Sequence, residues 1–229
     1  MKKQKLKTII ISLGGSVIVP KEINVKFLKD FKKLILKYVK RGKKFVIVVG
    51  GGKVARGYQN AAQQISKLSR SRLDWIGIYA THLNACLIKE IFGAKAVGII
   101  TDLEKPINTK KPIIIGAGTK PGWSTDYDAA VLANYYKTKT IINLSNVDYV
   151  YDKDPNKFKD ARPLTNLSWR DFLKIVNKKW KAGLNSPFDP VATRLAKKLG
   201  LEVIILKGTN LGNLEKFLKG EKFKGTVIR

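Results

Sequence analysis

The feature that most constrains the fold is a repeated alternation between continuous apolar runs and amphipathic segments. Runs rich in valine and isoleucine occur at residues 7–12, 44–50, 96–100, 112–117, 140–145 and 202–208. Because they are continuous rather than alternating, these runs are typical of strands buried on both faces, as in a parallel sheet. The pattern predicts an α/β protein, a three-layer sandwich whose central, mostly parallel sheet is flanked by helices.

The segments between the strands have the apolar spacing of helices. In the first of them, Asn24 is a candidate N-cap and Gly42 a stop signal. Residues 53–68 and 73–93 are also expected to be helical. Four further helices are expected to start near Asp126, Ser168, Pro187 and Asn210. No repeat or low-complexity linker interrupts the chain, so residues 1–229 are expected to form a single domain.

The charge of the chain is strongly positive. It has 45 lysines and arginines against 17 acidic residues, a net charge of +28. The basic residues are distributed over the whole sequence rather than gathered in one arm, which favours a solvated basic surface. Some nonspecific affinity for polyanions is expected. A basic nucleic-acid-binding protein remains an alternative, although no recognition motif for nucleic acid is evident.

Cysteine content and hydropathy bear on the compartment. The single cysteine, Cys86, excludes an intramolecular disulfide framework and is expected in the core of a protein from a reducing compartment. No apolar run approaches the roughly 20 residues that span a membrane. We therefore expect a cytoplasmic protein without a membrane partner.

Chemistry is expected at the strand exits, because open parallel sheets bind ligands beyond the carboxyl ends of their strands. One exit carries three consecutive glycines at residues 50–52, followed by Lys53 and Arg56. Glycine lets backbone N–H groups approach an anion closely, and the following helix N-terminus and the two cations add positive potential. The exit predicts an anion site that matches neither the Walker nor the dinucleotide pattern.

Two other exits also favour ligand binding. Residues 116–126, "GAGTKPGWSTD", contain more glycine than the capping residue Ser124 requires, which indicates a ligand loop with Lys120 or Trp123 near the ligand. Residues 145–155, "SNVDYVYDKDP", place tyrosines among acidic residues. That exit is compatible with a nucleoside or Mg²⁺–phosphate neighbourhood and also with an ordinary turn.

The sequence lacks the residues that several catalytic mechanisms require. The only histidine, His82, lies in a helical run and is interpreted as a packed helix residue, which excludes histidine-based triads and zinc sites with several His or Cys ligands. Phosphoryl transfer remains, because it depends on backbone amides, cations and Mg²⁺ more than on side-chain chemistry.

Taken in order, the exits resemble those of the amino acid kinase superfamily and, within it, the archaeal-type uridylate (UMP) kinases. The resemblance covers nearly the whole chain. It is carried by "SLGGSV", "VVGGGKVARGY", "LDWIGIYATHLNACLI", "GAGTKPGWSTDYDAAVLA", "LSNVDYVYDKDP" and "FDPVATRLAKKLG". It implies the amino acid kinase fold, with acceptor binding and oligomer contacts in the N-terminal part and ATP binding in the C-terminal part.

The resemblance also implies an activity. Such enzymes transfer the γ-phosphate of ATP to UMP, giving UDP and ADP, with Mg²⁺, and they act in pyrimidine nucleotide synthesis as cytoplasmic homohexamers. The alternative within the same fold is a kinase for another phosphate or carboxylate acceptor.

Position by position, the resemblance assigns three groups of residues. The ATP-binding residues are Gly14, Gly15, Ser16, Gly52, Arg56, Ser145, Asn146, Tyr151 and Asp154. The UMP-binding residues are Gly51, Asp74, Thr119, Lys120, Pro121, Gly122, Trp123, Ser124 and Thr125. The catalytic residues are Arg56 and Asp126, and no Mg²⁺ ligands are assigned. Asp74 also begins the expected helix 73–93, so a charge on the helix dipole is its structural alternative.

The chain departs from the family pattern at two positions. Many members carry a lysine where this chain has Ser12, and that lysine meets the transferring phosphoryl group. The candidates to replace its charge are Lys53, Arg56, Lys120 and Lys207, with Arg56 first. Many members also have glycine where this chain has Tyr149, which is expected to reshape the nucleoside pocket.

Overall fold

The computed structural model describes residues 8–105, 107–155, 157–179 and 187–229. Its centre is an eight-stranded sheet with the order β3-β4-β2-β1-β5-β9-β10-β8. The strands are β1 (Thr8–Leu13), β2 (Lys44–Val49), β3 (Ala96–Ile100), β4 (Ile113–Gly116), β5 (Thr140–Ser145), β8 (Asn166–Leu167), β9 (Glu202–Lys207) and β10 (Thr226–Ile228). All pairings are parallel except that of β10 with β9. A separate two-stranded sheet pairs β6 (Val150–Tyr151) with β7 (Pro163–Leu164).

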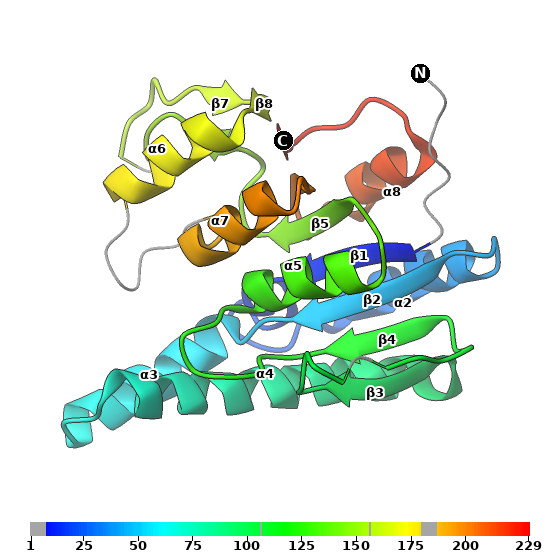
Figure 1. Ribbon diagram of the computed structural model, residues 1–229, viewed down its shortest axis with the longest axis horizontal. Helices are drawn as coiled ribbons and strands as arrows, with labels where there is room; N and C mark the ends of the chain where they lie inside the picture. The colour runs from blue at the N-terminus through cyan, green and yellow to red at the C-terminus, as the bar shows by residue number, and fades with distance from the viewer. Residues whose placement is uncertain (1–7, 106, 156, 180–186) are drawn as a thin grey trace.

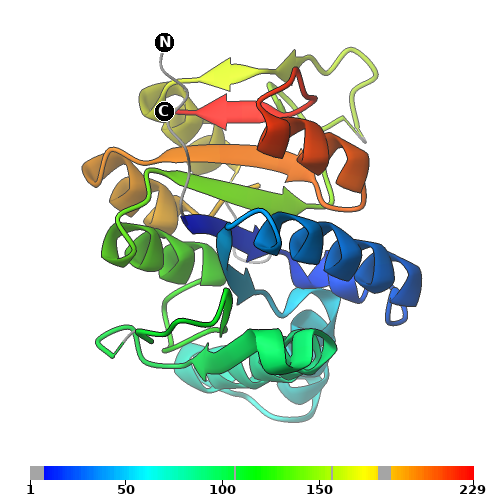
Figure 2. The same ribbon diagram turned by 90° about the vertical axis from the view of Figure 1, so that its right-hand side faces the viewer.

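Helices cover both faces of the sheet, which gives the three expected layers (Figures 1 and 2). Buried side chains of α2, α4 and α8 pack on one face, and those of α5, α6 and α7 pack on the other. The helices are α1 (Gly15–Ile18), α2 (Val25–Val39), α3 (Gly52–Ile65), α4 (Arg70–Phe92), α5 (Thr125–Tyr135), α6 (Trp169–Lys179), α7 (Pro190–Lys198) and α8 (Leu211–Lys219). A short 3₁₀ turn, η1 (Gly93–Lys95), leads from α4 to β3.

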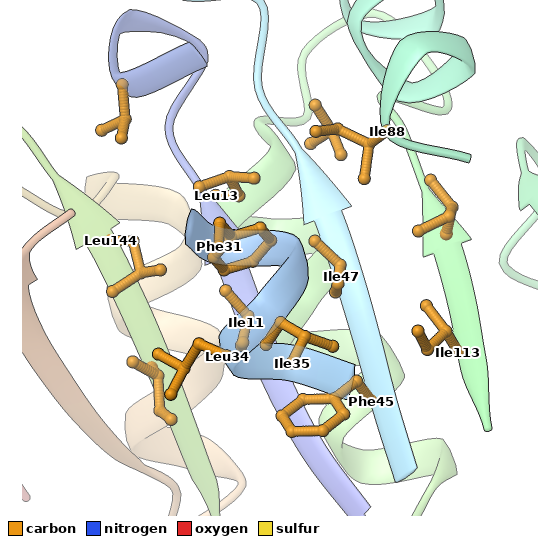
Figure 3. Close-up of a cluster of buried hydrophobic side chains, with 14 of the residues drawn as sticks. Ile11, Leu13, Phe31, Leu34, Ile35, Phe45, Ile47, Ile88, Ile113 and Leu144 are labelled. Carbon is orange, nitrogen blue, oxygen red and sulfur yellow. The ribbon is translucent and has the colours of Figure 1, made fainter. Parts of the chain in front are cut away.

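The core is built from the continuous apolar strands. Figure 3 shows Phe31, Leu34 and Ile35 of α2 lying over Ile11 of β1 and Ile47 of β2. Phe31, Ile11 and Ile47 have at most 1% of their surface exposed. Each fully buried side chain of this size contributes about 1.5–3 kcal/mol to folding, so the sheet and its α2 face form a rigid support for the strand exits.

Strand register brings those exits together. Leu13 at the end of β1 lies opposite Val49 of β2 and Leu144 of β5, and Ser145 lies opposite Lys207 at the end of β9. The carboxyl ends of four neighbouring strands therefore finish at the same level. The loops that follow β1, β2, β5 and β9 emerge side by side at one edge of the sheet.

Most expected elements are confirmed, and two helix starts differ. Asn24 caps α2 by accepting from the N–H of Phe27, as expected. Helix α4 begins at Arg70, capped by Ser69, so Asp74 lies inside the helix and the interpretation as a first-turn dipole charge is wrong. Helix α7 begins at Pro190 rather than near Pro187, because Asp189 caps it.

The short elements α1, β6, β7, β8 and β10 have two to four residues each and were not expected from the sequence. Cys86, expected in the core, is exposed on α4. None of the helices described has the length and apolar character needed to cross a membrane.

Candidate active site

Two glycine loops meet backbone to backbone at the exits of β1 and β2. A Cβ atom placed on Gly15 would lie 2.3 Å from the carbonyl oxygen of Gly50, and one on Gly52 would lie 2.3 Å from the N atom of Ser16. Gly52 also has a φ of +61°, which L side chains rarely adopt. Both positions therefore require glycine, and backbone atoms rather than side chains form the contact between the two loops.

The loop after β1 is fixed on its other side by β5. The N–H of Gly14 donates to the carbonyl of Leu144 at 2.9 Å. The predicted donor residues Gly14, Gly15 and Ser16 thus lie between the end of β5 and the triple-glycine loop (residues 50–52).

Arg56 brings a positive charge to this loop. It lies in the second turn of α3, and its Nη2 donates to Oγ of Ser16 at 3.2 Å. The other candidate cations are placed differently. Lys53 is exposed, Lys207 forms an ion pair with Asp148 at 3.1 Å, and Lys120 stands over an aromatic ring. Arg56 is the candidate that contacts the loop after β1.

Asp126 connects three elements at the same edge of the sheet. Its Oδ1 accepts from the Ser12 hydroxyl at 2.8 Å and from Nδ2 of Asn143 at 2.9 Å. Its Oδ2 accepts from the N–H of Asp189 at 3.2 Å. Burial raises the pKa of Asp126 to about 6, and the hydrogen bond from Ser12 opposes that rise. The carboxyl group joins β1, β5 and the start of α7.

Ser12 thus has a defined partner in the absence of the lysine expected there. A serine hydroxyl at this position donates to Asp126 without adding charge. The positive charge near the loop comes instead from α3, through Arg56.

The β4–α5 loop (residues 117–124) is held by three side chains of α4. Oγ1 of Thr81 accepts from the N–H of Gly118 at 2.8 Å, and Nε2 of His82 lies 2.8 Å from the Gly118 carbonyl. Because a carbonyl only accepts, the proton of the His82 ring is on Nε2. Asp74 accepts from the N–H of Gly122 at 2.9 Å. Helix α4 therefore fixes the loop at two points.

The same helix supports the triple-glycine loop. Nδ2 of Asn84 donates to the carbonyls of Gly50 and Gly51, at 2.9 and 3.4 Å. Thr81 and Asn84 are buried polar residues, and both point to loops at the strand exits. Helix α4 therefore contacts both the triple-glycine loop and the β4–α5 loop.

Aromatic and cationic groups cover part of the β4–α5 loop. Nζ of Lys120 lies 3.6 Å from the centre of the Trp123 ring, and that ring lies 4.5 Å from the ring of Tyr127. Ser124 caps α5 by accepting from the N–H of Tyr127, as expected. The side chain of Thr119 donates to the buried Asp128 at 2.9 Å. The loop is thus ordered from both α4 and α5.

The predicted nucleoside residues divide into two places. Ser145 is next to the loop after β1, since a Cβ on Gly14 would lie 3.8 Å from its Cα. Asn146 follows it and is exposed. Tyr151 belongs to β6, in the separate two-stranded sheet, and its ring lies 6.2 Å from that of Tyr149. Asp154 follows in the loop between β6 and β7.

Comparison with known proteins identifies the family. The model of the amino acid kinase family matches residues 7–207. The chain belongs to the amino acid kinase family. The uridylate kinase of Thermoplasma volcanium is 35% identical over 97% of both chains. The uridylate kinase of Methanocaldococcus jannaschii is 33% identical, over 96% of this chain and 98% of the relative.

Solved structures agree with this assignment. The uridylate kinase from Archaeoglobus fulgidus superimposes with a TM-score of 0.80 at 31% identity, covering 98% of this chain and 100% of the other. The UMP kinase from Bacillus anthracis has a TM-score of 0.81 over 99% and 97% of the two chains, and at 23% identity it supports the fold alone. The expected fold and the resemblance to archaeal uridylate kinases are confirmed.

Several members of the hydrogen-bond network in this family member were not found from the sequence. Asn143 is a polar residue within the buried part of a strand, and Asp128 is a carboxyl inside an alanine-rich helix. Thr81 and Asn84 interrupt the apolar pattern of α4 in a similar way. The available signal was a polar residue at a position expected to be buried. His82, interpreted as a packed residue, also contacts the β4–α5 loop.

Proposed function

We propose that this chain is a uridylate kinase, which transfers the γ-phosphate of ATP to UMP and forms UDP and ADP in pyrimidine nucleotide synthesis. The observation that carries the proposal is the backbone contact between Gly15 and Gly52. It places two glycine loops together at the strand exits, with Arg56 beside them. The names of the relatives, all uridylate kinases over nearly the full chain, support the same activity.

The proposed site has a donor part and an acceptor part. The C-terminal part of the domain, together with the loop after β1, binds ATP. The ATP-binding residues are Gly14, Gly15, Ser16, Gly52, Arg56, Ser145, Asn146, Tyr151 and Asp154. The acceptor part is Gly51, Asp74 and the residues from Thr119 to Thr125, which bind UMP. The two parts meet between Gly51 and Gly52, at the start of α3.

Phosphoryl transfer requires that two phosphates are held in line while negative charge spreads over the transferred group. In this chain, backbone N–H groups of the two glycine loops and the N-terminus of α3 provide fixed donors. Arg56 contributes the charge that the position of Ser12 lacks. Asp126 acts as an organiser of the catalytic site, because both of its oxygens already accept hydrogen bonds from the ends of β1 and β5 and the start of α7.

Mg²⁺ is proposed as the cofactor that neutralises charge on the ATP phosphates. No group of three or more His, Cys, Asp or Glu side chains among the described residues is arranged to hold a metal. Mg²⁺ does not require such a group, because it keeps several waters and is commonly bound through substrate phosphates with one or two carboxylates rather than by a protein cage. The residues of this chain then act by placing the phosphates.

A homo-oligomer, with the hexamer as the proposed state, is supported by an apolar surface on α3 and α4. These two helices pack against each other along one edge of the molecule (Figure 1). They expose the large side chains of Tyr58, Ile65, Trp75, Tyr79 and Leu83. An exposed apolar group of this size is typical of subunit contacts.

The proposed compartment is the cytoplasm. The exposed lysines of α2 support weak, nonspecific polyanion affinity.

A different acceptor is the second candidate, and the aromatic pair Trp123 and Tyr127 favours it, because it makes part of the β4–α5 loop apolar. An acceptor screen separates the two candidates. ADP formation is measured with ATP and Mg²⁺ and with UMP, dUMP, CMP, AMP, a small phosphonate or an isoprenoid phosphate. UMP is expected to be used far better than the others. Turnover with another acceptor and none with UMP would show that the acceptor assignment is wrong.

A further inference from the structure

Helix α5 buries a carboxyl group beside the β4–α5 loop. Its neighbours Ala129, Ala130 and Ala133 pack on the sheet, and Asp128 among them has 0% of its surface exposed. Oδ1 of Asp128 accepts from the Thr119 hydroxyl at 2.9 Å, while no described residue forms a hydrogen bond to its buried Oδ2. A buried carboxyl with an unpaired oxygen destabilises a fold, and an alanine at position 128 would avoid that cost. Asp128 is therefore expected to have a role other than packing.

The contact that Asp128 makes completes the anchoring of the loop. On the α4 side, Gly118 is held by Thr81 and His82, and Gly122 is held by Asp74. On the α5 side, the side chain of Thr119 is held by Asp128. Thr119 is the first residue of the segment proposed to bind UMP. Its hydroxyl is thus held by a carboxyl group that is itself fully buried.

We propose that Asp128 is a positioning residue that acts through Thr119 to hold the β4–α5 loop in the form that binds the acceptor nucleotide. This inference rests on the proposed function, because it takes residues 119–125 as the UMP loop. It assigns Asp128 to acceptor affinity rather than to the rate of phosphoryl transfer. The Thr119 proton is committed to the carboxylate, so a ligand group that meets this oxygen must donate to it, as an N–H or a hydroxyl does.

The ionisation of Asp128 supports this role. Burial, with a smaller contribution from the charge of Asp126, raises the pKa of Asp128 to about 7, while the hydrogen bond from the Thr119 hydroxyl and the charge of Lys120 oppose the rise. Lys120 and Asp126 are therefore the charged groups that act on Asp128. Below neutral pH the carboxyl becomes protonated, and the Thr119 hydroxyl then donates to a neutral oxygen, which is a weaker acceptor than the carboxylate. Acceptor affinity is expected to fall there in the wild type.

Three substitutions separate positioning from folding. Thr119→Val and Asp128→Val remove the hydrogen bond from either side, and Asp128→Asn keeps an oxygen that accepts from Thr119 but does not titrate. Thr138→Val is the matched control, because Thr138 is also buried near α5 with an unpaired hydroxyl, at the opposite end of the helix. Steady-state kinetics with UMP and ATP and thermal unfolding are measured for each protein from pH 6 to 8.5.

The valine variants are expected to raise the KM for UMP about tenfold, while kcat and the KM for ATP change by less than about threefold. The double variant is expected to be no worse than either single variant, because both remove the same bond. Asp128→Asn keeps a neutral acceptor for Thr119, so at pH 8 its KM for UMP is expected to lie between those of the wild type and the valine variants. From pH 8 to pH 6, the KM for UMP is expected to rise more in the wild type than in Asp128→Asn. Thr119→Val is expected to lack this additional rise, because it lacks the hydroxyl that Asp128 holds.

Opposite results have distinct meanings. Valine variants that melt at a lower temperature but keep the wild-type KM for UMP would give Asp128 a structural role only, and the inference would be wrong while the kinase assignment stood. If Asp128→Val does not fold, Thr119→Val and Asp128→Asn still decide the question. A wild-type protein that turns over no UMP would overturn the proposed function, and this inference with it.

Discussion

Ser12 donates its hydroxyl proton to Asp126 across 2.8 Å and so connects the end of β1 with the first turn of α5. The bond lowers the pKa of Asp126, which burial has raised to about 6. In Ser12→Ala this hydrogen bond is lost. The effect of burial is then less opposed, so the pKa of Asp126 rises further. We expect the acid limb of the pH–rate profile to move to higher pH, with kcat about three- to tenfold lower at pH 6.5.

The profile is measured from pH 5 to 9 with saturating ATP and UMP. The control is Ser66→Ala, which removes a serine hydroxyl at the C-terminal end of α3. UMP itself titrates near pH 6, but this affects the wild type and both variants equally. Identical profiles for Ser12→Ala and the wild type would show that Asp126 does not control the acid limb.

The contact between Gly15 and Gly52 makes a steric prediction. In Gly52→Ala, the new Cβ would lie 2.3 Å from backbone atoms of the loop after β1, at a φ of +61°. We expect a loss of about 3 kcal/mol or more in the free energy of unfolding and nearly complete loss of activity. Urea denaturation and ADP formation measure the two effects.

Gly57→Ala is the matched control on the same helix, because a Cβ there meets nothing within 4 Å. It is expected to leave activity intact and to stabilise the protein by roughly 0.5–1 kcal/mol, since alanine is the better helix former. If Gly52→Ala were as stable and as active as Gly57→Ala, the contact between Gly15 and Gly52 would not require glycine.

Arg56 is predicted to supply the positive charge at the donor loop. Because its guanidinium contacts Ser16, Arg56→Ala is expected to lower kcat/KM for ATP about 30-fold or more. Lys32→Ala removes an equal charge from an exposed position on α2 and is expected to change it less than about twofold. Initial rates at varied ATP and saturating UMP provide the measurement. An Arg56→Ala protein as active as Lys32→Ala would mean that another group has this role.

The sequence predicted the layers of the fold and the loops at the strand exits, but not the hydrogen bonds that connect the elements there. Continuous runs such as residues 140–145 predicted β5 with its observed bounds, because burial on both faces leaves a strong local signal. The bond from Asn143 to Asp126 spans 17 residues, and that from Ser12 spans 114. Such partners depend on strand order and register, which local patterns do not contain.

Helix boundaries failed for a similar reason. The expected helix at residues 73–93 starts three residues earlier, at Arg70, because the Ser69 side chain caps it after a polar segment without apolar spacing. That shift moved Asp74 into the helix, where it faces Gly122. Tertiary contact, rather than the helix dipole, explains its position.

Asp128 also predicts how stability changes with pH. Its pKa in the folded protein is about 7, above the ordinary value of 3.8. The folded state therefore binds the proton more tightly than the unfolded state. The resulting stabilisation is fully present below about pH 4 and is lost as pH rises through 7, by up to about 1.4 kcal/mol per pH unit.

The variant Asp128→Asn cannot titrate, so its free energy of unfolding lacks this contribution. The stability of the wild type relative to Asp128→Asn is expected to fall by about 2–4 kcal/mol between pH 4 and pH 8. Urea denaturation at each pH measures the difference, in which the other titrating groups cancel. A difference that is independent of pH would show that the carboxyl is ionised at an ordinary pKa.

The apolar surface of α3 and α4 predicts the effect of a charge on assembly. Leu83 is 66% exposed on α4, and a charge there would have to be buried in a subunit contact. Leu83→Asp is expected to shift the protein towards smaller species in sedimentation velocity, with the dissociation constant raised about tenfold or more. Val25→Asp is the control, because Val25 is 54% exposed but belongs to α2, which is not one of the two helices that form this surface. Unchanged assembly of Leu83→Asp, or equal disruption by Val25→Asp, would place the subunit contact elsewhere.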